Sequence, residues 1–215
     1  MKIKLCEMFC SIQGESSRAG YPSLFLRLAG CNLRCRYCDT VYAQAGGTSV
    51  PVKDLIEKAD QFRFADHITL TGGEPLYQGE THHLMKKLLG RGWVVQLETN
   101  GSLDLASVPE PVRKIVDVKT PSSGEADSFL MGNLTHLTPE DEIKFVISDR
   151  EDYIYSRTFL KKHLEKKEIV VNFSPVSGKM KGDELAALIL GDKLRVRLNL
   201  QLHKIIWPQG EPKES

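Results

Sequence analysis

Residues 30–40 read GCNLRCRYCDT, and the rest of the chain is organised around them because they place Cys31, Cys35 and Cys38 within eight positions. Thiolates at such short spacing can bind one metal centre. A closed tetrahedral zinc site needs four sulfur or nitrogen ligands, and no fourth Cys or His lies nearby in the sequence. Three cysteines would instead hold a 4Fe-4S cube by three of its irons and leave the fourth iron open. The stretch therefore predicts an open iron–sulfur site.

Two other interpretations of these cysteines remain open. They could pack as small apolar side chains, or they could bind zinc with a distant fourth ligand such as His67. Against packing, Asn32, Arg34 and Arg36 separate the cysteines and are poor core residues, and two guanidinium groups would offset the charge of a thiolate-bound cluster. The five cysteines of the chain are an odd number and clustered, which favours metal binding over a disulfide framework. Cys6 and Cys10 are predicted to be packing residues.

Length and charge restrict the remaining possibilities. A chain of 215 residues is long enough for one sizeable core, and we expect a single domain over residues 1–207 with a polar tail at 208–215. The formal charge of +1 gives no electrostatic indication of nucleic acid or an anionic membrane as a partner. The N-terminus has no apolar signal segment, and no apolar run reaches the roughly 18 residues of a membrane span. We therefore expect a cytoplasmic protein in a reducing compartment.

Strand and helix patterns alternate along the chain, which predicts an α/β fold with a mostly parallel sheet. An N-terminal strand or arm precedes this series, and the strands are too few for a closed eight-stranded barrel. We predict a partial, open (β/α) barrel. The predicted strands are 2–13, 22–29, 67–71, 93–98, 115–118, 142–147, 168–173 and 195–202, and the predicted helices are 52–62, 80–89, 153–166 and 183–190.

Unusual residues follow the predicted strands. Ligand-binding groups gather at the carboxyl ends of parallel strands, so we expect these segments to form one site together with the cysteine loop. Arg27 shares a strand face with Phe25 and either extends to solvent or points into a cavity to meet an anion. The segments are TGGEP (71–75), ETNG (98–101), DVKTP (117–121), NFSP (172–175) and QLH (201–203).

The three cysteines, with Tyr37 directly before the last of them, resemble the signature of the radical S-adenosylmethionine (SAM) enzymes. The segment Gly72-Gly73-Glu74-Pro75 resembles the glycine-glycine-glutamate element of that family. Its glycines permit close backbone approach and its carboxylate suits an ammonium group. The resemblance implies a partial-barrel fold and a 4Fe-4S cluster whose open iron is chelated by SAM. It also implies cleavage of SAM to a 5′-deoxyadenosyl radical.

Further motifs resemble the 7-carboxy-7-deazaguanine synthases within this superfamily. They are Ile12-Gln13-Gly14-Glu15, Arg27, Cys38-Asp39-Thr40, the segment DVKTPSSG at 117–124, and Gln201-Leu202-His203-Lys204. The resemblance implies conversion of 6-carboxy-5,6,7,8-tetrahydropterin to 7-carboxy-7-deazaguanine with release of ammonia, on the pathway to queuosine and the modification of tRNA. It further implies a homodimer and an electron donor such as flavodoxin or ferredoxin.

The resemblance also implies a role for individual residues. Cys31, Cys35 and Cys38 would bind the cluster, and Thr40 would contact Mg²⁺, a hard cation that prefers oxygen ligands, unless it only caps the loop. An Arg fork at position 27 suits a substrate carboxylate. The residues expected to bind SAM are Tyr37, Cys38, Asp39, Gly73, Glu74, Lys119, Thr120 and Pro121. Those expected around the pterin are Ile12, Gln13, Gly14, Glu15, Arg27, Thr71 and His203.

Two other functions compete with this one. A radical SAM activase that abstracts hydrogen from a glycine of a partner enzyme would share the cluster and Gly-Gly-Glu but needs no pterin pocket. A non-enzymatic zinc-binding interaction module is the alternative from another class. The set Gln13 to Glu15, Arg27 and Thr40 favours a small-molecule substrate over both.

Overall fold

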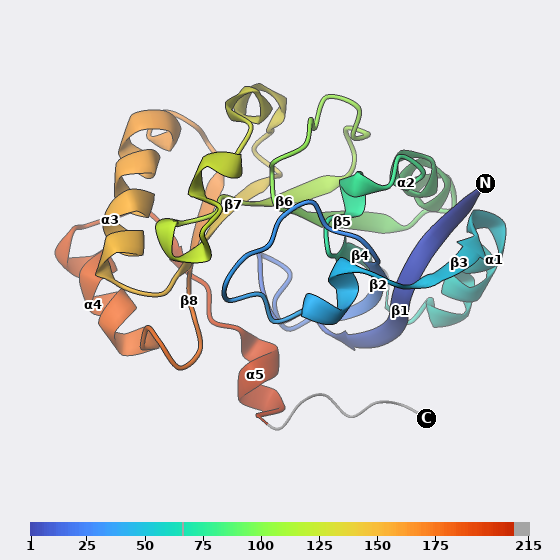
Figure 1. The fold of residues 1–215 in the computed structure, drawn as a ribbon, viewed down its shortest axis with the longest axis horizontal. Coiled ribbons are helices and arrows are strands. Elements are labelled where there is room, and N and C mark those ends of the chain that lie inside the picture. Colours follow the sequence, from blue (N-terminus) through green and yellow to red (C-terminus); the bar gives the residue numbers. More distant parts are fainter. Residues whose placement is uncertain (66, 209–215) are drawn as a thin grey trace.

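The computed structural model describes residues 1–65 and 67–208, and its centre is one nine-stranded sheet in the order β3-β1-β2-β4-β5-β6-β7-β8-β9 (Figure 1). From β2 to β9 every neighbouring pair is parallel, whereas β1 is antiparallel to both β2 and β3. The strands are β1 (Lys2–Ile12), β2 (Pro22–Leu28), β3 (Thr48–Pro51), β4 (His67–Gly72), β5 (Val94–Thr99), β6 (Arg113–Asp117), β7 (Glu142–Ile147), β8 (Val170–Pro175) and β9 (Arg197–Leu198).

Five α-helices connect or follow the described strands. In Figure 1, α1 and α2 lie at one end of the sheet, α3 and α4 at the other, and α5 below its middle. Their bounds are α1 (Val52–Ala59), α2 (Thr81–Gly90), α3 (Arg150–Phe159), α4 (Gly182–Gly191) and α5 (Leu202–Ile206). A π-helical turn, Leu160–Leu164, continues α3. None of the helices in residues 1–65 and 67–208 is both long and apolar enough to cross a membrane.

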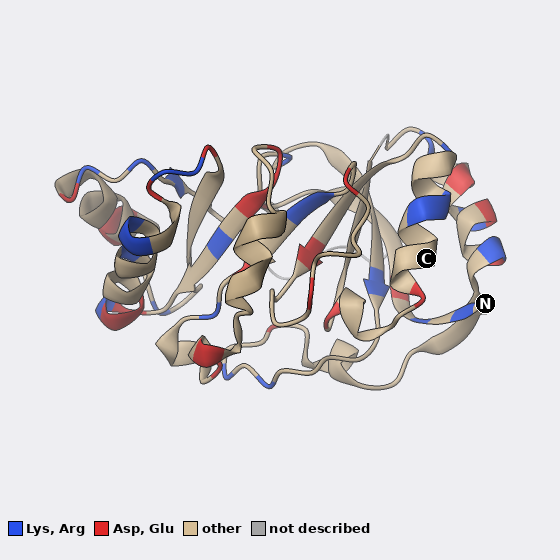
Figure 2. Ribbon diagram, turned by 90° about the horizontal axis from the view of Figure 1, so that it is seen from above, with Lys and Arg blue, Asp and Glu red and all other residues tan. Residues whose placement is uncertain are grey.

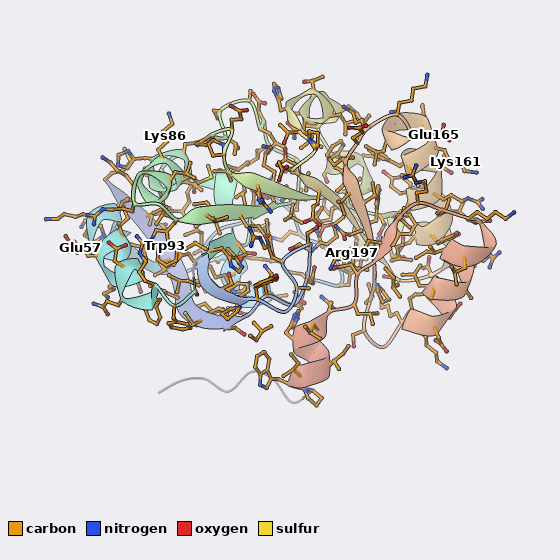
Figure 3. The ribbon with its side chains drawn as sticks, turned by 180° about the vertical axis from the view of Figure 1, so that it is seen from behind. Glu57, Lys86, Trp93, Lys161, Glu165 and Arg197 are labelled. Atoms are coloured by element: carbon orange, nitrogen blue, oxygen red, sulfur yellow. The ribbon has the colours of Figure 1, made fainter. Side chains whose placement is uncertain are left out.

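The two faces of the sheet differ in chemistry because side chains alternate along each strand. One face is apolar, for example Leu26 on β2, Leu70 on β4 and Phe145 on β7, and it packs in one core with apolar residues of the helices. Burying this face supplies most of the stabilisation, at roughly 25 cal/mol per Å² of apolar surface. The outer sides of the helices carry charged residues such as Glu57, Lys86 and Lys161, which extend away from the sheet (Figure 3).

The opposite, inner face is polar although it is buried. Thr69 and Gln96 on this face are at most 2% exposed. Both make a hydrogen bond to the loop that follows β1, and Thr69 also pairs with Ser23 of β2 at 2.9 Å. The Gln13 Nε2 donates to Thr69 Oγ1 at 3.1 Å, and the Ser16 and Gln96 side-chain oxygens lie 3.3 Å apart. Buried polar groups need such partners. Figure 2 shows that several of the central strands carry Lys, Arg, Asp or Glu within their length.

The predicted α/β fold with an open, partial barrel is confirmed, since the described sheet ends at β3 and β9 and does not close. The predicted strand 195–202 is wrong for most of its length. Only Arg197 and Leu198 pair with β8, and the backbone N–H of Asn199 still donates to Phe173. The chain then leaves the sheet and His203 lies on α5. Strand β3 was not predicted, and the predicted tail at 208–215 lies outside the described residues apart from Pro208.

Candidate active site

A cavity of about 280 Å³ lies at the carboxyl ends of the parallel strands. Most residues expected to bind the cluster, SAM, Mg²⁺ or the substrate line this one cavity. They are Ile12, Gln13, Gly14, Glu15, Arg27, Cys31, Cys35, Tyr37, Cys38, Asp39, Thr40, Thr71, Gly73, Lys119 and His203. Glu74, Thr120 and Pro121 are absent from the lining, and the first two are fully buried behind it.

The cysteine loop is held by two backbone hydrogen bonds and one side-chain hydrogen bond to the segments that follow three neighbouring strands. Gly30 accepts a hydrogen bond from the Glu74 N–H at 2.8 Å, and the Arg36 N–H donates to Ser123 at 2.9 Å. The Asn32 Nδ2 donates to Ser102 Oγ at 2.7 Å. The loop therefore has a set conformation before any ligand binds.

The three cysteines are free thiols that line one wall of the cavity. Burial raises the pKa of Cys31 and Cys35, so both thiols are protonated in the absence of a metal. Within residues 1–65 and 67–208 no three His, Cys, Asp or Glu side chains are gathered closely enough for a single ion. A cluster contacts each thiolate through a different iron, and Cys31, Cys35 and Cys38 all line the cavity in which it would lie.

The alternative of a zinc site completed by His67 does not fit the fold. His67 is the first residue of β4 and is 1% exposed, whereas the cavity lies at the other end of that strand, at Thr71 and Gly72. A parallel strand rises by about 3.3 Å per residue, so His67 and the cavity are separated by nearly the full length of β4. His67 therefore belongs to the amino edge of the sheet.

The segment Gly72-Gly73-Glu74-Pro75 packs directly against the cysteine loop. A Cβ on Gly73 would collide with the carbonyl oxygen of Gly30 and with the Cβ of Cys31, so only glycine permits this approach. Glu74 lies beneath it, and its carboxylate accepts hydrogen bonds from the Leu76 N–H, the Asn100 N–H and the Thr99 hydroxyl at 2.7–3.0 Å. Burial raises the pKa of this carboxyl. Glu74 thus joins the ends of β4 and β5 next to the cavity.

Lys119 enters the cavity beside the cysteines. Burial alone would lower the pKa of its ammonium, but Asp117 at 2.9 Å raises that pKa well above its usual value, so Lys119 is charged. Tyr37 closes the same region, with its hydroxyl 3.2 Å from Thr120 Oγ1. Burial, and next the charge of Asp117, raise the pKa of Tyr37 to about 12. A fixed cation and a neutral phenol therefore face the space next to the cysteine wall.

Thr40 lies between the cysteine wall and the rest of the cavity. It precedes the 3₁₀ turn Val41–Gln44 but makes no side-chain capping hydrogen bond there. Its Oγ1 lies 3.7 Å from Cys38 Sγ. The hydroxyl is therefore available to a ligand in the cavity, as the expected magnesium contact requires.

The other end of the cavity is formed by the loop after β1. Glu15 receives a hydrogen bond from Lys144 Nζ at 2.8 Å and from Gln201 Nε2 at 2.7 Å. Burial raises the pKa of Glu15, but the charge of Lys144 lowers it by more, to about 2. Gln13 donates to Glu98 at 3.3 Å and accepts from the Glu15 N–H at 3.1 Å. This end presents carboxylates and an amide to the cavity.

Arg27 points into the cavity, which decides between the two orientations left open by the sequence. Its Nε donates to Glu7 Oε1 at 2.6 Å, and its side chain is 16% exposed. The Phe9 and Tyr42 rings lie 5.8 and 6.0 Å from the guanidinium carbon. A planar cation held in this way suits a carboxylate ligand.

Helix α5 brings His203 to the cavity although the predicted strand is absent. The Leu202 N–H donates to the Gly14 carbonyl at 2.9 Å, and a Cβ on Gly14 would collide with the His203 ring. Lys204 Nζ also lies 3.2 Å from Asp39 Oδ2 in the cysteine loop. The start of α5 therefore covers both ends of the site.

Two charged residues of the site, Glu7 and Lys144, lie in none of the segments expected from the sequence, and Glu98 lies in the expected segment ETNG but was assigned no individual role. The Glu98 carboxylate accepts a hydrogen bond from the Thr71 hydroxyl at 3.0 Å, and burial raises the pKa of Glu98. Lys144 lies 2.8 Å from Glu15 and 3.7 Å from Asp117. The available signal for Glu7 and Lys144 was alternation, because each stands between apolar neighbours on a strand and its side chain therefore faces away from the side on which those neighbours lie.

Comparison with known proteins gives the same relationships from independent information. The model of the radical SAM superfamily matches residues 26–152. The chain is 44% identical to 7-carboxy-7-deazaguanine synthase of Koribacter versatilis, with 95% of this chain and 97% of that protein covered. It is 40% identical to the synthase of Chlorobaculum tepidum, with 95% and 94% covered.

Solved structures resemble the fold. The crystal structure of QueE from Escherichia coli superposes with a TM-score of 0.78 at 23% identity and covers 94% of this chain and 95% of that one. Streptococcus suis SuiB bound to S-adenosylmethionine gives a TM-score of 0.59 at 15% identity, over 86% of this chain and 51% of that one.

Proposed function

The chain belongs to the 7-carboxy-7-deazaguanine synthases of the radical SAM superfamily. On this premise we propose how the residues of its cavity carry out the synthase reaction. The substrate is 6-carboxy-5,6,7,8-tetrahydropterin, and the products are 7-carboxy-7-deazaguanine and ammonia. When bound, the cluster and SAM would supply a 5′-deoxyadenosyl radical for abstraction of hydrogen from the pterin carbon bearing the carboxylate. The reaction needs two ligands side by side in one space closed to water.

One observation carries the proposal: two chemically different sets of residues line the same cavity. In the first set Cys31, Cys35 and Cys38 would hold the cluster, while Gly73 and Lys119 would contact SAM. The second set is Gln13, Glu15 and Arg27, which suit a pterin edge and a carboxylate. An activase for a glycyl-radical enzyme would have no use for this second set.

We assign the SAM-side roles from the cavity outward. Lys119 is a fixed cation for the carboxylate of SAM, and Tyr37, Cys38 and Asp39 line the same space. Glu74, Thr120 and Pro121 act from behind the lining: Thr120 orients Tyr37, and Glu74 orients the end of β5. The Glu74 carboxylate is buried behind the lining, where Oε1 accepts from Leu76 and Thr99 and Oε2 accepts from Asn100 and Thr99. We therefore assign Glu74 an indirect role in binding the amino group of SAM, through the neighbouring Gly73 that does line the cavity.

The substrate-side roles follow from hydrogen-bonding capacity. Arg27 binds the substrate carboxylate, Glu15 and Gln13 face donors of the pterin ring, and the backbone of Ile12 and Gly14 lines the same end. Thr71 and His203 complete the enclosure. Thr40 would contribute a hydroxyl to a bound Mg²⁺, a hard cation that prefers oxygen ligands.

Other elements of the proposal concern the setting. We infer one catalytic domain over residues 1–207, a cytoplasmic location that keeps the thiols reduced, and a homodimer. The electron is supplied by a protein such as flavodoxin or ferredoxin. The product enters the queuosine pathway of tRNA modification.

The decisive experiment uses protein purified and reconstituted without oxygen. Reduced protein is incubated with SAM and 6-carboxytetrahydropterin, with and without Mg²⁺, and the products are identified by mass spectrometry. We expect 7-carboxy-7-deazaguanine, with a higher rate when Mg²⁺ is present. Formation of 5′-deoxyadenosine without any deazaguanine would overturn the substrate assignment, and a colourless zinc protein would overturn the reaction class.

A further inference from the structure

The guanidinium of Arg27 has most of its hydrogen-bonding capacity unused. An arginine carries five N–H donors, and in residues 1–65 and 67–208 the structure gives this one a single hydrogen bond, from Nε to Glu7 Oε1. The terminal Nη groups are therefore available on the cavity side, where Arg27 contributes to the lining. A planar group that is to receive a carboxylate through two parallel hydrogen bonds must be held in one orientation.

Glu7 is the residue that holds it. Glu7 lies opposite Arg27 in the antiparallel pairing of β1 with β2, and the register shifts between Leu5 and Glu7. Such a bulge turns the side chain that follows it to a new direction. Here one carboxylate oxygen of Glu7 accepts the Nε–H of Arg27 at 2.6 Å, which leaves the four terminal N–H donors for other partners.

The same carboxylate oxygen also receives a hydrogen bond from outside the sheet. The Tyr42 hydroxyl donates to Glu7 Oε1 at 2.8 Å, and the Tyr42 ring lies over the Arg27 guanidinium. Tyr42 belongs to the 3₁₀ turn that follows Thr40 in the cysteine loop. One oxygen of Glu7 thus connects β1, β2 and the end of the cysteine loop.

We propose that Glu7 is a positioning residue: it fixes the guanidinium of Arg27 for recognition of the substrate carboxylate and so determines the preference for carboxylated pterins. The inference rests on the proposed function, in which Arg27 meets that carboxylate. Glu7 itself does not contact the substrate.

Charge and position make opposite predictions for Glu7, which allows a sharp test. If Glu7 acted only through its charge, removing the charge would strengthen the binding of an anionic ligand at Arg27. If Glu7 acts by position, the loss of its acceptor oxygen weakens that binding. Glu7→Gln removes the charge and keeps an acceptor oxygen for Arg27 and Tyr42, whereas Glu7→Ala removes both.

The test measures binding of 6-carboxypterin and of pterin, which lacks the carboxylate, to the reconstituted protein by calorimetry without turnover. We expect Glu7→Gln to bind 6-carboxypterin with an affinity equal to or higher than that of the wild-type protein. Glu7→Ala should bind it at least about tenfold more weakly, which corresponds to about 1.4 kcal/mol. The binding of pterin should be unchanged by either substitution. In turnover, Glu7→Ala should raise KM for the carboxylated substrate and leave kcat nearly unchanged.

Controls separate positioning from folding and from the proposed function. Glu140 is paired with Arg113 at 3.3 Å, and neither residue lines the cavity. Glu140→Ala should therefore leave the affinities for 6-carboxypterin and for pterin unchanged. Glu7→Thr, a good strand former without the acceptor geometry, replaces Glu7→Ala if that variant fails to fold. Equal or tighter binding of 6-carboxypterin by the alanine or threonine variant would overturn the role of Glu7. Wild-type protein that shows no preference for 6-carboxypterin over pterin would instead refute the role of Arg27 in the proposed function.

Discussion

Replacing Glu15 by glutamine should destabilise the protein near neutral pH, and the loss should become smaller as the solution is acidified. The Glu15 carboxylate lies 2.8 Å from Lys144 Nζ and 2.7 Å from Gln201 Nε2, and its side chain is 13% exposed. Burial disfavours its charged form, but the ammonium of Lys144 favours that form more strongly and lowers the pKa of Glu15 to about 2. Glutamine cannot carry this charge.

The magnitude follows from the difference between the folded and unfolded pKa. A shift from 4.5 to about 2, at 1.36 kcal/mol per unit, corresponds to about 3 kcal/mol of stabilisation. Because the folded pKa is the lower one, this stabilisation is complete above the unfolded pKa and is lost as the pH falls toward the folded pKa. About 2 kcal/mol remains at about pH 3.5. The difference between wild type and Glu15→Gln should therefore shrink by about 1.4 kcal/mol between about pH 6 and about pH 3.5.

Urea unfolding followed by tryptophan fluorescence measures this difference on protein without ligands at both pH values. Glu140→Gln is the matched control, because Glu140 is 72% exposed and pairs with Arg113 at the surface. Glu140→Gln should change the free energy of unfolding by less than about 1 kcal/mol. A loss for Glu15→Gln that is equal at both pH values, or larger in acid, would refute the account of Lys144 and Glu15.

Three further substitutions test other parts of the structure. Cys35→Ala should abolish iron binding by the reconstituted protein, as measured by a colorimetric iron assay. The control Cys10→Ala, on β1 and outside the cavity lining, should retain the full iron content. Loss of iron in both variants would place the cluster elsewhere. Gly73→Ala should lower both the melting temperature and the cluster content, because its Cβ collides with the Gly30 backbone; unchanged values would mean that the cysteine loop adjusts freely. Phe145→Ala, fully buried between Phe159 and Phe173, should cost about 3–5 kcal/mol in urea unfolding, and a cost below about 1 kcal/mol would show that the core collapses to fill the space.

The parts of the fold that the sequence predicted are those with strong local patterns. The segment 142–147 alternates between apolar and polar residues and is β7 with the same bounds. The amphipathic spacing of Val52, Leu55, Ile56 and Ala59 likewise predicted α1, whose buried residues are those four. In both cases one face is buried, so the pattern and the structure have the same cause.

The failures occurred where tertiary contacts decide the local structure. Residues 195–198 alternate like a strand, but only Arg197 and Leu198 find a partner in β8. The following residues are directed by long-range hydrogen bonds, from Leu202 N–H to Gly14 and from Gln201 to Glu15. No local pattern encodes these contacts. The segment 48–51 is short and two of its residues are exposed, so it has no clear strand pattern of its own. It forms β3 because it pairs with β1.

The site was predictable in its motifs and not in its charge pairs. Residues at the ends of parallel strands were expected to converge, and TGGEP, ETNG, DVKTP and QLH all contribute to the cavity lining. The segment NFSP (172–175) was expected there as well, but none of its residues line the cavity. Which carboxylate accompanies which cation depends on register across strands. Glu7 faces Arg27 because of a register shift in β1, and Lys144 meets Glu15 across 129 positions of sequence. Neither partner could be identified without the sheet.

Each cation of the cavity has a carboxylate partner supplied by the protein. Arg27 is paired with Glu7, Lys119 with Asp117, and Lys144 with Glu15. Without these partners burial would lower the pKa of both lysines and favour their neutral forms, whereas the structure raises both.

This pairing has a consequence for ligand binding. The cations are charged and oriented before a ligand enters, so binding does not require them to be protonated or reoriented. A carboxylate that never touches a ligand thereby determines whether the neighbouring cation can bind one. Substitutions of these carboxylates should therefore change ligand binding through the protonation or the orientation of the cation, and the two routes are separable because only the first depends on pH.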